Sequence, residues 1–114
     1  MILAVQGSRS FNDYSIFLNG MGTAMFGMDK EDKEIFIYSA GPYRINEMAR
    51  TFISVSDFKG RGIKAQLRKV PPSWIRENIH LLDHFAYFSV PKEVLPAIVN
   101  TVRGKDVPTE VYRY

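Results

Sequence analysis

The feature that most restricts the fold is a repeated alternation between short apolar runs and segments with helical periodicity. The runs at positions 2–5, 35–38 and 85–90 contain no charged residue, which is typical of strands buried on both faces of a parallel sheet. Apolar residues spaced three and four apart follow each run, the pattern of a helix packed on a sheet. Parallel strands joined by helices need right-handed crossovers, so the alternation predicts an α/β fold with helices on both faces of the sheet.

Two further strands are less strongly marked. In 63–68, apolar residues alternate with Lys64, Gln66 and Arg68, which predicts a strand with one polar face at or near a sheet edge. The β-prone residues 110–114 predict a terminal strand or a segment for self-association. A chain of 114 residues is long enough for one core. We therefore expect a single domain, 1–114, with a mainly parallel sheet of four to five strands.

Several helix boundaries are suggested by capping residues. Asn12 or Asp13 is suited to cap a helix from Tyr14 onwards, in which three glycines each weaken the helix by up to about 1 kcal/mol. Ser73 is a plausible N-cap for a helix reaching His84. We expect Pro91 to open the last helix, with Val94 and Leu95 among its inward residues and with Gly104 as its C-cap.

Composition removes several classes of function. The chain has no cysteine, so disulfide and thiolate chemistry are excluded, and a reducing cytoplasm is permitted. No apolar run approaches the ~20 residues that span a bilayer, and the apolar start lacks the basic region of a signal peptide. We expect a cytoplasmic protein that does not associate with membranes. His80 and His84 are expected on one helix without a third ligand, so no metal site is predicted.

The first candidate site follows the first apolar run. Gly7 to Ser10 form a small-residue loop before a predicted helix. Backbone N–H groups at a helix start attract anions, and a glycine allows a ligand to approach closely. Arg9 adds a planar cation suited to phosphate. A generic turn before a surface helix has the same composition, so this loop alone leaves both interpretations open.

A second loop of the same kind follows the second run. Ser39, Ala40, Gly41 and Pro42 precede the strongest helical pattern in the chain, and Arg44, Asn46 and Glu47 belong to its first turn. The carboxyl ends of parallel strands meet at one edge of a sheet, where α/β proteins bind ligands at the point of strand-order reversal. The sequence therefore predicts that the two loops share one rim.

Three stretches together resemble a known superfamily. The segment from Gly7 to Phe11 with Asp13-Tyr14, the segment from Ser39 to Ala49, and the stretch from Arg76 to Phe88 are similar in order and spacing to motifs of the SLOG superfamily. Its Rossmann-like domains include the YspA-type proteins, which the chain resembles most, the DNA-processing protein DprA and the Lonely-guy phosphoribohydrolases. The resemblance implies binding of a nucleotide or nucleotide-derived ligand, without a further cofactor. The implied ligand contacts are Gly7, Ser8, Arg9, Ser10, Phe11, Gly41, Pro42, Tyr43, Arg44, Asn46, Arg76 and Asn78.

The chain also departs from the superfamily pattern. Val90-Pro91-Lys92-Glu93 stands where phosphoribohydrolases carry a proline-glycine-glycine turn and a downstream glutamate. A binding protein is therefore favoured over an enzyme. If there is an activity, the resemblance implies N-glycosidic hydrolysis of a nucleoside monophosphate with Glu47 as the catalytic carboxylate.

Two more functions are compatible with the sequence. The first is binding of single-stranded nucleic acid through a basic run, although a solvated edge strand has the same composition. The second is a protein-inhibiting module of the kind carried by phages and mobile elements. Helical faces rich in Met, Phe and Ile also suggest a homodimer or higher oligomer. The basic run consists of Lys59, Arg61, Lys64, Arg68 and Lys69.

Overall fold

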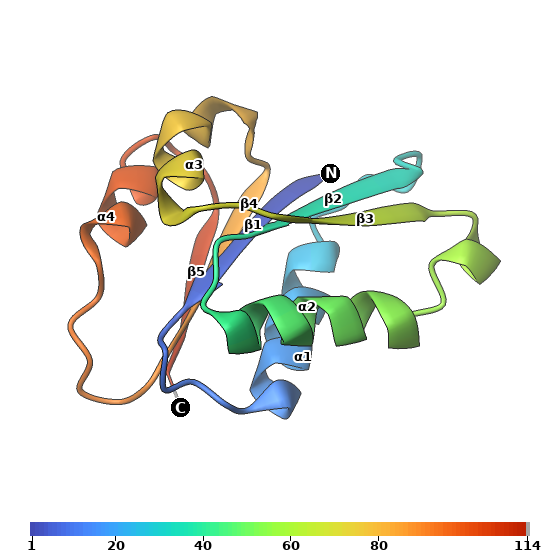
Figure 1. Cartoon of the computed structure of the whole chain (residues 1–114). Helices are drawn as coiled ribbons and strands as arrows, with labels where there is room; N and C mark the ends of the chain where they lie inside the picture. Colours follow the sequence, from blue (N-terminus) through green and yellow to red (C-terminus); the bar gives the residue numbers. More distant parts are fainter. Residues whose placement is uncertain (114) are drawn as a thin grey trace.

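The computed structural model describes residues 1–113 and shows a five-stranded, all-parallel sheet in the order β3-β2-β1-β4-β5 (Figure 1). This confirms the predicted α/β architecture. The strands are β1 (Ile2–Gly7), β2 (Glu34–Ser39), β3 (Lys64–Lys69), β4 (His84–Ser89) and β5 (Thr109–Arg113). The helices are α1 (Tyr14–Met25), α2 (Tyr43–Val55), α3 (Pro72–Glu77) and α4 (Ala97–Arg103), with short 3-10 turns η1 (Lys59–Arg61) and η2 (Ile79–Leu81).

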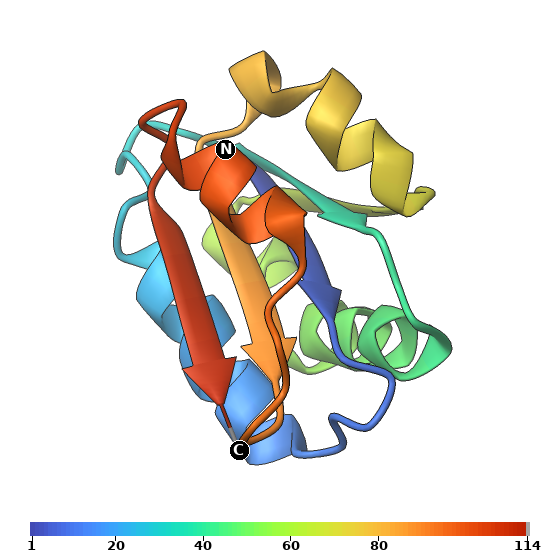
Figure 2. The same ribbon diagram turned by 90° about the vertical axis from the view of Figure 1, so that its left-hand side faces the viewer.

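The helices cover both faces of the sheet. Helices α1 and α2 pack on one face, and α3 and α4 pack on the other (Figures 1 and 2). The side chains of β1 alternate between the two cores, with Leu3 and Val5 toward α1 and α2 and Ala4 toward α3 and α4. The chain crosses from β3, at one edge, to β4 on the far side of β1. Strand order therefore reverses between β1 and β4, where ligand crevices form in such sheets.

Helix α1 follows the sequence prediction closely. The side chain of Asp13 accepts a hydrogen bond from the backbone N–H of Ile16 and caps the helix. Gly20 lies against the rings of Phe88 and Tyr112, which a β-carbon at that position would meet at 2.8 and 2.9 Å. A glycine in mid-helix is thus explained by close packing of α1 on β4 and β5.

Helix α3 is shorter than predicted. Pro71 occupies the N-cap in place of Ser73, and the helix ends at Glu77. The side chain of Asn78 donates to the carbonyl oxygen of Trp74, which satisfies an acceptor at the helix end. His80 lies in the 3-10 turn η2, and His84 is the first residue of β4. The prediction that the two histidines share one helix is wrong.

Helix α4 starts later than predicted. Pro91 does not open it, because Lys92 adopts a φ of 68° and Pro96 forms the N-cap with an extended backbone. A residue before proline disfavours the helical region, so Leu95 stays outside the helix. Val94, expected to face inward, is 89% exposed, whereas Leu95 packs against the second core as expected.

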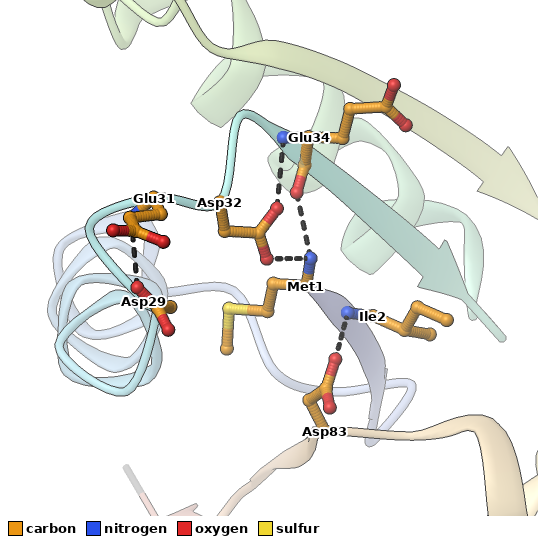
Figure 3. Close-up of polar contacts among 7 residues, drawn as sticks. All are labelled: Met1, Ile2, Asp29, Glu31, Asp32, Glu34 and Asp83. Carbon is orange, nitrogen blue, oxygen red and sulfur yellow. Dashed lines mark hydrogen bonds and ion pairs between the residues drawn. The ribbon is translucent and has the colours of Figure 1, made fainter.

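The first two residues tie the amino-terminal end of the sheet together (Figure 3). The ammonium group of Met1 forms an ion pair with Asp32 and donates to the carbonyl oxygen of Glu34, 2.8 Å away. The N–H of Ile2 donates to the carboxylate of Asp83 at 2.7 Å. These contacts join β1 to the segments that lead into β2 and β4. Among residues 1–113, no helix has the length and apolar character needed to cross a membrane.

Candidate functional site

The loops after β1 and β2 are hydrogen-bonded to each other. The N–H of Gly7 donates to the carbonyl oxygen of Gly41 at 3.1 Å, and the N–H of Ala40 donates to that of Val5 at 2.9 Å. The N–H of Ser8 donates to the carbonyl oxygen of Phe88 at 2.7 Å, so the β1 loop also contacts the end of β4. These bonds confirm the prediction that the loops after β1 and β2 share one rim of the sheet.

The two glycines of these loops have different roles. A β-carbon on Gly7 would lie 2.6 Å from Cδ1 of Ile45 and 2.8 Å from the carbonyl oxygen of Phe88. Gly7 is therefore needed for packing between β1, β4 and α2, and it does not open the backbone to a ligand. Gly41 has a φ of 83° with open space beside it, so the backbone conformation requires glycine there.

Some predicted ligand residues are used inside the protein. Phe11 is fully buried, with its ring centroid 5.4 Å from that of Phe88. It supports the loop from the core, so its prediction as a ligand contact is wrong. The side-chain oxygen of Asn46 accepts a hydrogen bond from the hydroxyl of Ser39 at 2.5 Å, which holds the first turn of α2 against the end of β2.

Four of the predicted residues reach solvent at the rim. Arg9, Ser10, Tyr43 and Arg44 are exposed, while Pro42 is partly buried. Tyr43 as a whole is 70% exposed. Within residues 1–113, neither arginine forms an ion pair. The rim therefore carries two free guanidinium groups and an accessible aromatic ring.

A hollow of about 300 Å³ lies between the start of α1 and the first turns of α2. The hydroxyl of Tyr14 is buried without a hydrogen-bond partner, and burial raises the pKa of this phenol. Because this oxygen is closed to solvent, Tyr14 lines the hollow with other atoms than its hydroxyl. Tyr14 was not predicted as a site residue, because its spacing places it in the apolar stripe of the helix. The lining residues are Asn12, Tyr14, Tyr43, Arg44, Glu47, Met48 and Thr51.

Glu47 is held by two neighbours on α2. Its carboxylate accepts from the hydroxyl of Tyr43 at 2.9 Å and pairs with Nε of Arg50 at 3.3 Å. The hydrogen bond to Glu47, and then its charge, raise the pKa of Tyr43. The two contacts fix the position of the carboxylate beside the hollow.

The third predicted group lies apart from the two loops. Asn78 caps α3, and Arg76 lies on the opposite face of the sheet from α1 and α2. There Arg76 lines a second hollow of about 250 Å³ together with Gln6, Ser73, Pro96, Ala97 and neighbouring residues. The side-chain oxygen of Gln6 is buried and has no hydrogen-bond partner. The sequence did not point to Gln6 as a site residue, because it directly follows the apolar run of the first strand.

Glu93 lies at the carboxyl end of β4, next to the point between β1 and β4 where strand order reverses. Its carboxylate accepts from the hydroxyls of Tyr87 and Ser89, each at 3.3 Å, and from that of Ser8. Burial alone would raise the pKa of Glu93, but these bonds and one from the backbone of Val90 leave it below its usual value. Burial raises the pKa of Tyr87 to about 12, with further contributions from Glu93. The chain thus places its own carboxylate at the point of strand reversal.

The basic run lies on η1 and β3, along one edge of the sheet. All five of its cations are exposed, and none forms an ion pair with an acid in the described part of the chain. The guanidinium of Arg61 lies over the ring of Phe58, 5.2 Å from its centroid, and Arg68 donates to Gln66 at 3.2 Å. This edge is separate from the hollow beside α1 and α2.

Comparison with protein-family models, with curated proteins and with solved structures gives no significant match. Among residues 1–113 there is also no group of three or more His, Cys, Asp or Glu side chains placed to hold a metal ion. The function is therefore inferred from the residues of this chain.

Proposed function

We propose that the protein binds a nucleotide or nucleotide-derived ligand at the rim formed by the loops after β1 and β2. The observation that carries the proposal is the hollow of about 300 Å³ whose lining combines an exposed aromatic residue, Tyr43, with an arginine that has no acid partner among the described residues, Arg44. Aromatic rings stack on bases, and guanidinium groups bind phosphate in a planar, bidentate manner.

The individual roles follow from position. Arg44 lines the hollow and neutralises the phosphate, and the exposed Arg9 and Ser10 on the loop after β1 supply a second guanidinium and a hydroxyl outside it. Tyr43 stacks on the base. Ligand pockets generally measure about 300–1,000 Å³, so the hollow accommodates the base or the sugar-phosphate, and the remainder of the ligand lies over the exposed rim.

Hydrolysis of an N-glycosidic bond is the second candidate. It is favoured by one observation, namely that Glu47 lines the same hollow and is held in place by Tyr43 and Arg50. An ionised carboxylate suits the stabilisation of an oxocarbenium-like transition state. Incubation with nucleoside monophosphates and chromatography for free base tests it, because release that is unchanged in Glu47→Gln would contradict this role.

Membership of the SLOG superfamily and a cytoplasmic location are part of the same proposal. The Rossmann-like strand order and the hydrogen-bonded loops after β1 and β2 support the first. The absence of cysteine is compatible with the second.

The proposal is tested by thermal unfolding and calorimetry with nucleoside mono- and diphosphates, cyclic dinucleotides and ADP-ribose. A ligand at one hundred times its Kd adds about 2.7 kcal/mol to the free energy of unfolding by linkage. Arg44→Gln should weaken this ligand strongly, whereas Arg103→Gln, a matched change of an exposed arginine on α4, should not. The proposal fails if no compound gives heat or stabilisation, or if the two variants bind equally well.

A further inference from the structure

Strand β3 leaves a row of backbone groups unpaired at the edge of the sheet (Figure 1). The N–H of Lys64 donates to the carbonyl oxygen of Lys33 at 2.8 Å, and the N–H of Val70 donates to that of Ser39 at 2.9 Å, so the even positions bond toward β2. Backbone groups alternate in direction along a strand. Those of Ala65, Leu67 and Lys69 therefore point away from the sheet, where the described chain supplies no further strand.

A large hollow adjoins this edge. It measures about 700 Å³ and lies between the carboxyl end of α2 and the start of β3. Its lining includes Val55, which is 65% exposed, together with Ile53, Ile63 and Ala65. Ala65 belongs both to the unpaired edge and to the hollow. A strand added beside β3 would thus place an apolar side chain directly into this space.

The same edge carries positive charge that the protein does not neutralise. Lys64 and Arg68 lie on one side of β3, and Lys69 lies on the other. None has an ion-pair partner among residues 1–113. Like charges placed opposite each other destabilise strand pairing, whereas opposite charges stabilise it. The edge therefore disfavours pairing with another copy of itself and favours an acidic strand.

We propose that the β3 edge binds an extended, acidic segment of a partner protein, which adds to the sheet as a sixth strand. Its backbone bonds to the outward groups of Ala65, Leu67 and Lys69. Its carboxylates lie opposite Lys64 and Arg68, and one of its apolar side chains fills the hollow beside Val55. Such strand addition gives affinity through backbone bonds and specificity through alternate side chains. The site is independent of the proposed nucleotide site.

Single-stranded nucleic acid fits this edge less well. Sequence-independent binding of single strands combines cations with exposed aromatic platforms on which bases stack. Near the cations, Phe58 is 4% exposed and lies under Arg61. Tyr38, the register partner of Arg68, is partly buried and stacks on Trp74 with ring centroids 4.1 Å apart, so one face of its ring is already covered. An alternating row of backbone donors and acceptors also matches a peptide strand, whose groups alternate in the same way.

The test begins with selection of random eight-residue displayed peptides on the full-length protein. Peptides with alternating acidic and apolar residues are expected, and the best is measured by fluorescence polarisation. The double variant Lys64→Glu/Arg68→Glu should weaken it by about tenfold. The control variant Arg103→Glu/Lys105→Glu reverses two exposed cations at the end of α4 and should leave the affinity nearly unchanged.

Methylation of the peptide backbone tests strand addition without altering the protein. N-methyl groups on one set of alternate residues should abolish binding, and those on the other set should be tolerated, because one set of N–H groups faces β3. The proposal is overturned if selection yields no acidic peptides, if both methylated sets bind equally, or if the charge reversal has no effect. Displacement of the peptide by an oligothymidine of higher affinity would assign the edge to nucleic acid instead.

Discussion

Gly20 and Gly22 lie two residues apart in α1, and their surroundings predict opposite effects of the same substitution. A β-carbon at position 22 would have no neighbouring atom within 4 Å. Gly22→Ala should therefore raise the free energy of unfolding by about 0.8–1 kcal/mol, the difference in helix propensity between the two residues. At position 20 the added carbon would lie 2.8 Å from a ring carbon of Phe88 and 2.9 Å from one of Tyr112.

Gly20→Ala gains the same helix propensity but forces an extra methyl group into a packed core. Overpacking costs about 1–3 kcal/mol, so the net change in the free energy of unfolding lies between about 0 and −2 kcal/mol. The difference between the two variants cancels the propensity contribution and isolates the overpacking cost. Two rings have to shift, which places the expected difference near the middle of that range, at about 2 kcal/mol.

Urea unfolding monitored by far-UV circular dichroism measures both variants on the same scale, provided the m-value stays constant. Thermal unfolding gives a second readout, since about 1 kcal/mol corresponds to roughly 4 °C in a domain of this size. If Gly20→Ala stabilises the protein as much as Gly22→Ala does, α1 does not pack tightly on β4 and β5.

Three further predictions concern titratable groups. The ammonium group of Met1 and the backbone of Glu34 hold the pKa of Asp32 below its usual value. The stability that the Asp32 carboxylate contributes is therefore lost as pH falls through its folded-state pKa. Asp32→Asn should remove this acid sensitivity in urea titrations at pH 2–5. Burial lowers the pKa of His84 below its ordinary value of 6.5, so the free energy of unfolding should decline as pH falls below about 6.5. This decline should be less steep in His84→Phe. It should be as steep in the control variant His80→Gln as in the unaltered protein. Glu93→Gln should lower the midpoint of urea unfolding at pH 7, because a neutral amide is a weaker acceptor than a carboxylate for the surrounding hydroxyls. The difference in midpoint between the two proteins should shrink at pH values below the folded-state pKa of Glu93. An unchanged midpoint in Glu93→Gln at pH 7 would contradict the hydroxyl contacts.

The sheet was predictable from the sequence because its signals are local. Buried strands have continuous apolar runs, and the edge strand β3 alternates polar and apolar residues. Periodicity alone did not give the boundaries of α3 and α4. The restriction that Pro96 places on Leu95 is a local signal for the late start of α4, whereas a distant contact holds the segment after α3. The bond between the N–H of Ile2 and Asp83 spans 81 positions of the chain. The positive φ of Lys92 and the extended N-cap at Pro96 delay α4, and periodicity alone does not encode either.

The candidate site was predictable in its location and less so in its residues. Parallel strands place their carboxyl ends on one edge, so the loops containing Gly7 and Gly41 had to meet. Which side chains face solvent depends on packing. Phe11 turns into the core, whereas Tyr14, expected in the core from its spacing, is only partly buried and helps to line the hollow.

The position of Glu93 explains why the proposed ligand is placed on the β2 side of β1. Topology alone favours the point between β1 and β4 where strand order reverses, but there the carboxylate of Glu93 already accepts from Ser8, Tyr87 and Ser89. A phosphate at this point would meet a negative charge and would have to take over these hydroxyls. On the other side of β1, Arg44 has no acid partner among the described residues, and the carboxylate that lines the same hollow, that of Glu47, is paired with Arg50. Electrostatics thus directs the anionic part of a ligand away from the point of strand reversal and toward the hollow beside α2.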